Sequence, residues 1–175
     1  MSPLSRVCAA VSLALGAGGS AVAAEAHPRN AAFLELGGPG LLYSVNYERT
    51  VQARLALRGG FSRFALVEQG TDRSMGATLF PLTAAALVGK GGHHLECGIG
   101  ATLGAFDGNL NVAVGEPRAR VPFVAGVGQV GYRYQAPASG LLLRAAFTPL
   151  LTGTRFMPLG SPVLPWGGIS AGWRF

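Results

Sequence analysis

The sequence predicts an all-β fold, namely an eight-stranded antiparallel β-barrel preceded by a cleavable signal peptide. Three observations support this prediction. Apolar and polar residues alternate with period two in several separate segments, as on strands that have two different faces. Charged residues make up 13% of the 175 residues, against about 25% in ordinary soluble domains. No stretch after residue 24 approaches the roughly 18 apolar residues of a spanning helix. Because only a closed barrel then satisfies its backbone in lipid, the barrel is predicted to be transmembrane.

The first 24 residues have the layout of a secretory signal peptide. Arg6 supplies a positive start, residues 7–18 form an apolar stretch, and the small residues of 21–24 are typical of a cleavage site. We place cleavage after Ala24, with Ala23 as the second choice. A buried N-terminal helix in a cytosolic protein is the alternative. Residues 25–30 would then be a short lead-in and residues 31–175 the barrel, in which Cys97 is the only cysteine and no disulfide is expected.

Alternation and turn residues divide the barrel region into strands. Residues 43–48 (YSVNYE) alternate most clearly, with aromatic or branched residues at the odd positions and polar residues at the even ones. The same pattern recurs in 54–62, 94–103, 141–148 and 169–175. The predicted strands are 31–37, 41–49, 53–66, 75–88, 93–105, 119–135, 140–150 and 166–175.

The breaks between these strands alternate in length, as in outer-membrane barrels with short periplasmic turns and longer external loops. The short breaks are 50–52, 89–92 and 136–139, and the long ones are 67–74, 106–118 and 151–165. Residues 37–40 (GGPG) are the exception, predicted to form a tight external turn. The apolar residues fall on even positions before this turn and on odd positions after it, which favours two strands. One long bulged strand is the alternative.

Charge decides which face points outward. A soluble barrel needs charges over its outer face, and a chain whose only lysine is Lys90 has too few. The apolar faces are therefore predicted to meet lipid and the polar faces to line the lumen. An eight-stranded barrel has room inside for side chains only, so no open solute pore is expected. The polar faces carry Glu35 and a predicted lumen charge network of mixed sign, formed by Glu48, Arg54, Arg58, Glu96 and Arg144.

Aromatic residues near the strand ends are typical of the girdles at the two membrane interfaces. The candidates are Tyr43, Tyr47, Tyr132, Tyr134, Trp166 and Trp173. The last strand ends in Trp173-Arg174-Phe175, with the terminal Phe on the same face as Trp173.

This amphipathic last strand resembles the C-terminal signal by which the barrel assembly machinery recognises its substrates, with Trp173 and Phe175 as the signal residues. Residues 31–175 are similar in size and layout to OmpA/OmpX-type eight-stranded barrels. The segments LELGGPGLLYSVNYER, GKGGHHLECGIG, GYRY and PWGGISAGWRF look like a group of small barrels without assigned activity. The resemblance implies the cell outer membrane of a Gram-negative bacterium, with outer-membrane lipid and the assembly machinery as partners. Residues 31–175 resemble only the barrel of OmpA and not its periplasmic peptidoglycan-binding domain, so the resemblance is not expected to extend to a cell-wall tethering role.

Motifs that suggest chemistry have structural explanations in this chain. Residues 126–131 match GxGxxG, but a nucleotide site needs that run to open a helix, and here the strand alternation continues. His93 and Cys97 fall on one strand face and His94 and Glu96 on the other, which does not assemble a zinc site. No serine has a histidine two residues away on the same face. No catalytic, cofactor or metal residues are predicted, and the scattered arginines argue against nucleic-acid binding.

The sequence thus favours a non-enzymatic outer-membrane barrel with a structural or surface-interaction role. Its external loops, above all 106–118 and 151–165, would contact a protein or surface ligand that the sequence does not specify. Two alternatives stay open. One is a lipid-modifying outer-membrane barrel enzyme, and the other is a soluble periplasmic lipocalin-like binding barrel.

Overall fold

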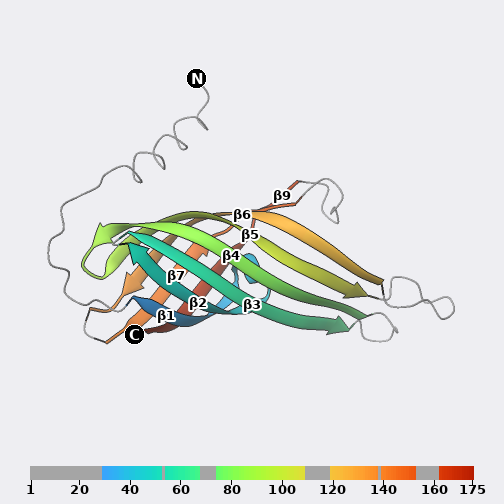
Figure 1. The fold of residues 1–175 in the computed structure, drawn as a ribbon, viewed down its shortest axis with the longest axis horizontal. Coiled ribbons are helices and arrows are strands. Elements are labelled where there is room, and N and C mark those ends of the chain that lie inside the picture. The colour runs from blue at the N-terminus through green and yellow to red at the C-terminus, as the bar shows by residue number, and fades with distance from the viewer. Residues whose placement is uncertain (1–28, 53, 68–73, 109–118, 138, 153–161) are drawn as a thin grey trace, which may run out of the picture.

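The computed structural model describes residues 29–52, 54–67, 74–108, 119–137, 139–152 and 162–175, which fold into one β-barrel (Figure 1). The predicted signal peptide and most of the lead-in lie outside these residues. No helix among the described residues is long and apolar enough to cross a membrane. The strands are β1 (Asn30–Gly37), β2 (Tyr43–Gln52), β3 (Leu55–Val67), β4 (Ser74–Lys90), β5 (His93–Gly108), β6 (Ala119–Gln135), β7 (Leu141–Phe147), β8 (Leu150–Leu151), β9 (Val163–Leu164) and β10 (Gly167–Arg174).

The sheet closes on itself, so its strands form a ring without a free edge. Each strand from β1 to β7 pairs antiparallel with the next, β7 pairs with β10, and β10 pairs with β1. The short β8 continues β7 beyond Thr148 and Pro149, and the short β9 pairs with it. The ring therefore has eight strands, as the sequence predicts, and the predicted eight-stranded antiparallel barrel is confirmed.

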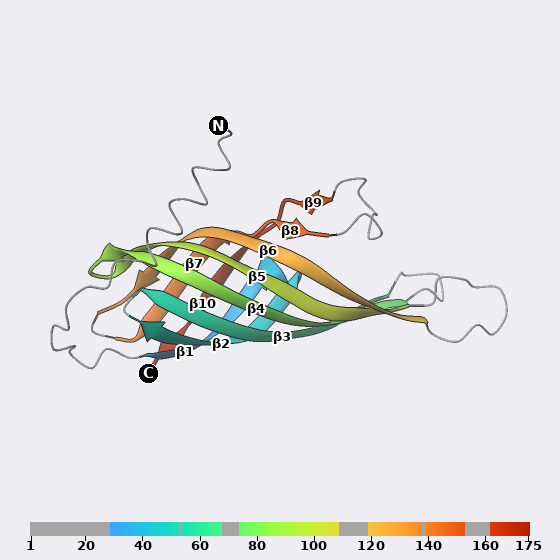
Figure 2. The ribbon, with the colours of Figure 1, turned by 45° about the horizontal axis from the view of Figure 1, so that its top comes forward.

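The two ends of the barrel differ. The terminal end holds Asn30 and Phe175, whose backbones hydrogen-bond to each other, together with the turns after β2, β4 and β6. The opposite end, here called the loop end, carries the longer connections. At this end β3 to β6 run on past the shorter strands and form a long wall on one side of the mouth, which is clear in Figure 2. Strands β4, β5 and β6 have 17, 16 and 17 residues, whereas β1 and β7 have 8 and 7.

Burial follows the predicted alternation, with apolar side chains outside and polar ones inside. On β1 the outward Leu34 and Leu36 are 62% and 60% exposed. On β2 the outward positions are odd instead, and Val45 is 54% exposed. The parity change lies between two antiparallel strands that pair in register, so the predicted break within 37–40 is confirmed and the single bulged strand is wrong.

Element boundaries differ from the prediction mainly at the turns. Residues 50–52 belong to β2, and Gly89 and Lys90 belong to β4, so the connections at the terminal end are shorter than predicted. Residues 106–108 extend β5 instead of starting a loop. Two antiparallel strands continue to pair as long as each has a backbone opposite the other. Glycine and short polar residues do not prevent this pairing, so the strands extend into residues that were expected to form turns. Most of the predicted long loops lie outside the described residues.

Candidate functional site

The centre of the lumen holds a network of buried ion pairs, here called the lumen network. Its members are three carboxylates and three guanidinium groups, all on inward positions of the ring: Glu35, Glu48, Glu96, Arg58, Arg133 and Arg144. Each is at most 6% exposed. The charges of the six side chains cancel, and a buried set of charges is tolerated only when it is balanced and hydrogen-bonded.

Arg58, on β3, joins the carboxylates of two other strands. Its Nη2 atom lies 2.8 Å from Oε2 of Glu48 and 2.9 Å from Oε1 of Glu96. Its guanidinium carbon also lies 4.9 Å from the centre of the Phe33 ring, a cation–π distance. Glu48 is the register partner of Arg58 on β2, whereas Glu96 reaches it across the lumen from β5. Arg58 therefore links its neighbour β2 to β5, which lies two strands away in the other direction around the ring.

Glu96 has the largest number of cationic partners in the lumen network. Besides Arg58, Nε of Arg144 lies 3.0 Å from its Oε1 atom, and Nη1 of Arg133 lies 3.5 Å from its Oε2 atom. Gln129 donates a further hydrogen bond from its side-chain amide to Oε1. Glu96 is thus the single carboxylate that contacts all three arginines.

The other two carboxylates are each held by one arginine, Glu48 by an arginine of β6 on the opposite side of the ring and Glu35 by an arginine of β7, two strands away. Arg133 donates to Glu48, and Nη1 of Arg144 lies 2.5 Å from Oε1 of Glu35. Ser44 and Ser170 donate to Glu35 at 3.4 and 3.3 Å. These two serines are paired with a carboxylate and not with an imidazole, which is the arrangement of a structural hydroxyl.

The structure brings together Glu48, Arg58, Glu96 and Arg144 of the sequence-predicted network and leaves out Arg54. Arg54 is exposed in the turn between β2 and β3, so its placement in the lumen is wrong. Alternation assigns faces only to residues inside a strand, and β3 begins at Leu55, one residue after Arg54.

Sequence reasoning missed Arg133 and misplaced Trp166. Arg133 lies between the outward Tyr132 and Tyr134, so strand parity alone would have turned it inward. Trp166 was predicted in an interfacial girdle, but it is half-buried and packs against an inner cluster of Ala125, Val127 and Leu150. It has the even, inward parity of Ser170. Tyr43, Tyr47, Tyr132 and Trp173 are outward and 41–53% exposed, which is consistent with a girdle.

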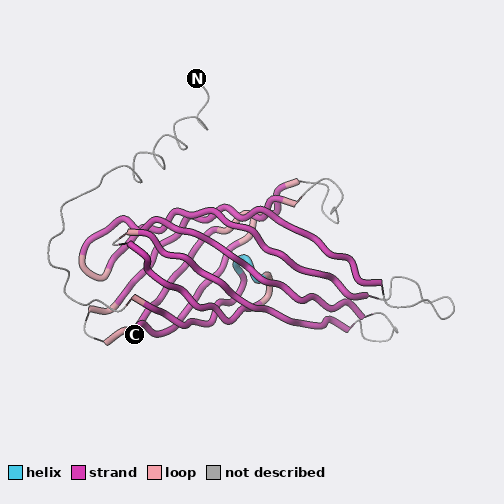
Figure 3. Tube along the Cα trace, in the orientation of Figure 1, coloured by secondary structure: helices cyan, strands magenta, loops and turns pink. Residues whose placement is uncertain are grey.

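A short helical turn, η1 (Gly38–Gly40), closes the mouth of the lumen above the network. It lies inside the barrel outline in Figure 3, and all three of its residues are buried. It was predicted as an external turn, and it does connect β1 to β2 at the loop end, but it folds inward. Thr102 donates to the Pro39 carbonyl at 2.9 Å, and Trp166 Nε1 donates to the Leu41 carbonyl at 3.1 Å.

The inward fold of η1 depends on glycine. Gly38 has φ of +66°, and a Cβ atom there would lie 2.5 Å from the Glu35 carboxyl carbon. Only glycine combines this backbone conformation with so close an approach. Leu41, at the other end of the turn, also has a positive φ of 66°, which its packing and the Trp166 hydrogen bond maintain. The lumen network and η1 are therefore in direct contact through Glu35.

Comparisons with known proteins place the fold. No protein-family model matches the chain, and no curated protein sequence matches it significantly. The N-terminal β-barrel domain of Pseudomonas aeruginosa OprF is similar in structure, with a TM-score of 0.60 and 14% identity over 85% of this chain and 99% of that one. Ail of Yersinia pestis, solved with the heparin analogue sucrose octasulfate, has a TM-score of 0.54 and 12% identity over 85% and 99% of the two chains. Neisserial surface protein A has a TM-score of 0.54 and 12% identity over 85% and 96%. The chain has the fold of the small eight-stranded outer-membrane barrels.

Proposed function

We propose that the chain is a non-enzymatic barrel of the cell outer membrane with a structural or surface-interaction role. The observation that carries the proposal is the inverted distribution of polarity. Large apolar side chains cover the outer face, where Ile99 is 72% exposed, while six ionised groups are buried inside. Soluble monomers rarely expose an apolar surface of this extent to water, whereas the outer face of a membrane barrel is apolar because it contacts lipid. This argues against the soluble lipocalin-like alternative.

We infer that the lumen does not conduct solutes. Glu48, Arg58 and Glu96 span it with contacts of 2.8 and 2.9 Å, and η1 covers the network from the loop end. An eight-stranded ring leaves room for side chains and little else. The buried charges are therefore assigned a structural role, which is to hold the walls of a narrow barrel together.

The long wall supports a surface-interaction role. Strands β5 and β6 pair from His93 and Tyr134 at the terminal end to Gly108 and Ala119 beyond the mouth. The described ends of this wall, Gly108 and Ala119, therefore lie away from the bulk of the barrel. Stacked rings of Phe106 and Phe123, 4.7 Å apart, stiffen this part of the wall. A rigid support of this kind is typical of loops that contact a partner.

The lipid-modifying alternative has less support. Ser44 and Ser170 donate to Glu35 deep in the lumen, and His93 lies at the terminal end beside Tyr132. A serine nucleophile needs a base within hydrogen-bond reach. The partners we propose are therefore outer-membrane lipid, the barrel assembly machinery and a ligand of the external loops, with no role for nucleic acid.

We expect the mature protein to show heat-modifiable mobility on a denaturing gel. A closed barrel has no free backbone edge and resists detergent until it is boiled, so unboiled and boiled samples would migrate differently. The measurement is made on the detergent-extracted membrane fraction of a Gram-negative host. A single unchanged band, with the protein recovered in the soluble periplasmic fraction, would contradict the membrane placement.

Deleting Phe175 is expected to lower the amount of assembled barrel without reducing export. Phe175 is 59% exposed on the outer face beside the closing pair with Asn30, so it contributes little packing to the finished wall. The proposed role is recognition by the assembly machinery, to which Trp173 contributes as well. The amount of heat-modifiable protein is compared with the total amount of this protein in the periplasm and the membrane. The control is Phe147→Ala, which removes an outward side chain of similar exposure. Normal assembly of the truncated chain would refute this role.

A further inference from the structure

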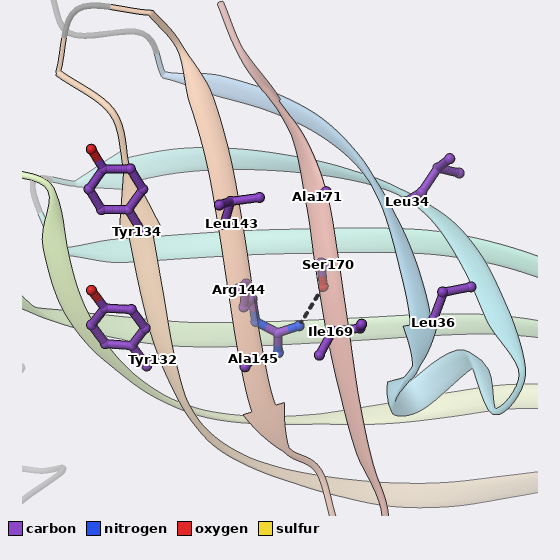
Figure 4. A pocket seen from close by; sticks show the side chains of 10 residues that line it. All are labelled: Leu34, Leu36, Tyr132, Tyr134, Leu143, Arg144, Ala145, Ile169, Ser170 and Ala171. Carbon is purple, nitrogen blue, oxygen red and sulfur yellow. Dashed lines mark hydrogen bonds between the residues drawn. The ribbon is translucent and has the colours of Figure 1, made fainter.

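A hollow of 670 Å³ lies on the outer face of the barrel, across four adjacent strands (Figure 4). One side is formed by Tyr132 and Tyr134 of β6, and the other by Leu34 and Leu36 of β1. The four strands β6, β7, β10 and β1 are neighbours in the ring and span roughly 14 Å at their usual spacing of about 4.8 Å. We call this hollow the outer groove.

The outer groove exists because small residues lie between larger ones. Ala145 and Ala171 occupy outward positions on β7 and β10, where most other outward residues are long. Arg144 and Ser170 lie behind these strands, on the lumen side, as Figure 4 shows. The groove surface is therefore apolar apart from the tyrosine hydroxyls at one edge.

The tyrosine side of the outer groove is held in place. The ring of His93 lies 5.2 Å from that of Tyr134 and 6.0 Å from that of Tyr132, and His93 also hydrogen-bonds to the Tyr132 hydroxyl. These contacts fix the direction of both rings. The groove is thus bounded by ordered side chains.

The terminal end of the barrel, next to the outer groove, carries positive charge. Arg29, Arg49, Arg54 and Lys90 are all exposed there, and we call them the basic rim. No Asp or Glu side chain of the described residues lies at this end. Glu35, Glu48 and Glu96 are in the lumen, and Asp107 lies near the loop end, 3.7 Å from Arg120. No described Asp or Glu side chain is therefore exposed at the basic rim to neutralise it.

We propose that the outer groove binds one acyl chain of an anionic phospholipid whose phosphate lies at the basic rim. The proposal rests on the membrane placement proposed above and on the short turns predicted to be periplasmic, which lie at the terminal end and put it at the periplasmic leaflet. An apolar groove in the lipid-facing band takes a hydrocarbon chain, and basic side chains near a bilayer surface attract anionic headgroups. Trp173, 53% exposed on β10 between Ala171 and the terminal end, lies where the chain would meet the headgroup.

The chain contains two tryptophans, which makes this site directly measurable. Trp166 is inside the barrel, so a Trp166→Phe variant leaves Trp173, next to the outer groove, as the only tryptophan, whose emission is excited selectively over that of tyrosine. This variant is inserted into phosphatidylcholine vesicles that contain increasing fractions of either brominated phosphatidylglycerol or brominated phosphatidylcholine. Quenching of Trp173 then reports which lipid is next to the groove. Insertion is scored independently by heat-modifiable mobility.

We expect brominated phosphatidylglycerol to quench Trp173 with about fivefold higher apparent affinity than brominated phosphatidylcholine, the preference that one basic side chain contributes near an anionic headgroup. Filling the groove by Ala145→Leu with Ala171→Leu should make the two curves coincide. Ala84→Leu is the matched control, because Ala84 faces outward on β4, across the ring from β10. It should leave the preference unchanged. Replacing Arg29 and Arg49, the members of the basic rim next to β1, with Gln should reduce the preference.

Three results would overturn the proposal. The first is coincident quenching curves for the inserted Trp166→Phe protein. The second is an undiminished preference after the groove is filled, which would assign the effect to the basic rim alone. The third is a cross-linked dimer that is lost in the groove-filled variant, which would make a second copy of the chain the occupant. Failure of the protein to insert would instead refute the proposed membrane function.

Discussion

Replacing Glu96 with Gln is expected to destabilise the folded barrel by about 3–5 kcal/mol, the cost of removing one member of a buried ion-pair network. Glu96 is fully buried and contacts Arg58, Arg133 and Arg144. Without its charge, three buried guanidinium groups share two carboxylates. The free energy of unfolding is measured by urea titration of the barrel refolded in lipid vesicles.

A double variant provides the control. Removing Arg58 together with Glu96 leaves the Arg144 pair with Glu35 and the Arg133 pair with Glu48, so the remaining charges balance. We therefore expect Glu96→Gln with Arg58→Gln to cost less than the sum of the two single variants, by about 1–3 kcal/mol of coupling. Additive costs would show that the contacts are not energetically coupled, and the lumen network would then have no structural role as a unit.

Replacing Ile99 with Arg is expected to cost about 2–4 kcal/mol of barrel stability in lipid, the penalty for a cation at the bilayer midplane. Ile99 is 72% exposed on the outer face of β5. It lies six residues from His93, and at about 3.3 Å per residue with a tilt of about 40° it is roughly 15 Å from the terminal end. That is close to the middle of the apolar band.

Leu57→Arg is the depth control for this substitution. Leu57 is also outward, at 45% exposed, but it lies near the start of β3 and pairs in register with Arg49 of the basic rim. Its cost should be about 0–1 kcal/mol, as for cations near the interface. Refolding yields into vesicles and urea midpoints are compared for the two variants. Equal tolerance of both arginines would contradict a lipid-facing outer wall.

Much of the lumen network could be predicted, because each member lies inside a strand whose parity is clear. Glu48, Glu96 and Arg144 alternate with apolar neighbours, and the structure turns all three inward. Arg133 shows the same alternation, because it lies between two outward tyrosines. Those tyrosines were assigned to the girdle from the sequence, whereas Arg133 was not assigned to the lumen. Arg54 shows the limit of the method, since it precedes the first residue of β3 and alternation assigns no face to a turn residue.

By itself, the sequence determined the strands, their two faces and the parity change around residues 37–40, because these depend on local alternation and on where glycine and proline interrupt it. Which charges meet is decided only by the tertiary structure. The Arg144 contact with Glu35 joins residues 109 apart, and the Trp166 bond to Leu41 joins residues 125 apart. Such contacts depend on ring closure and on the stagger of the strands. Whether a turn folds into the mouth depends on the space that the other strands leave there, which no local pattern records.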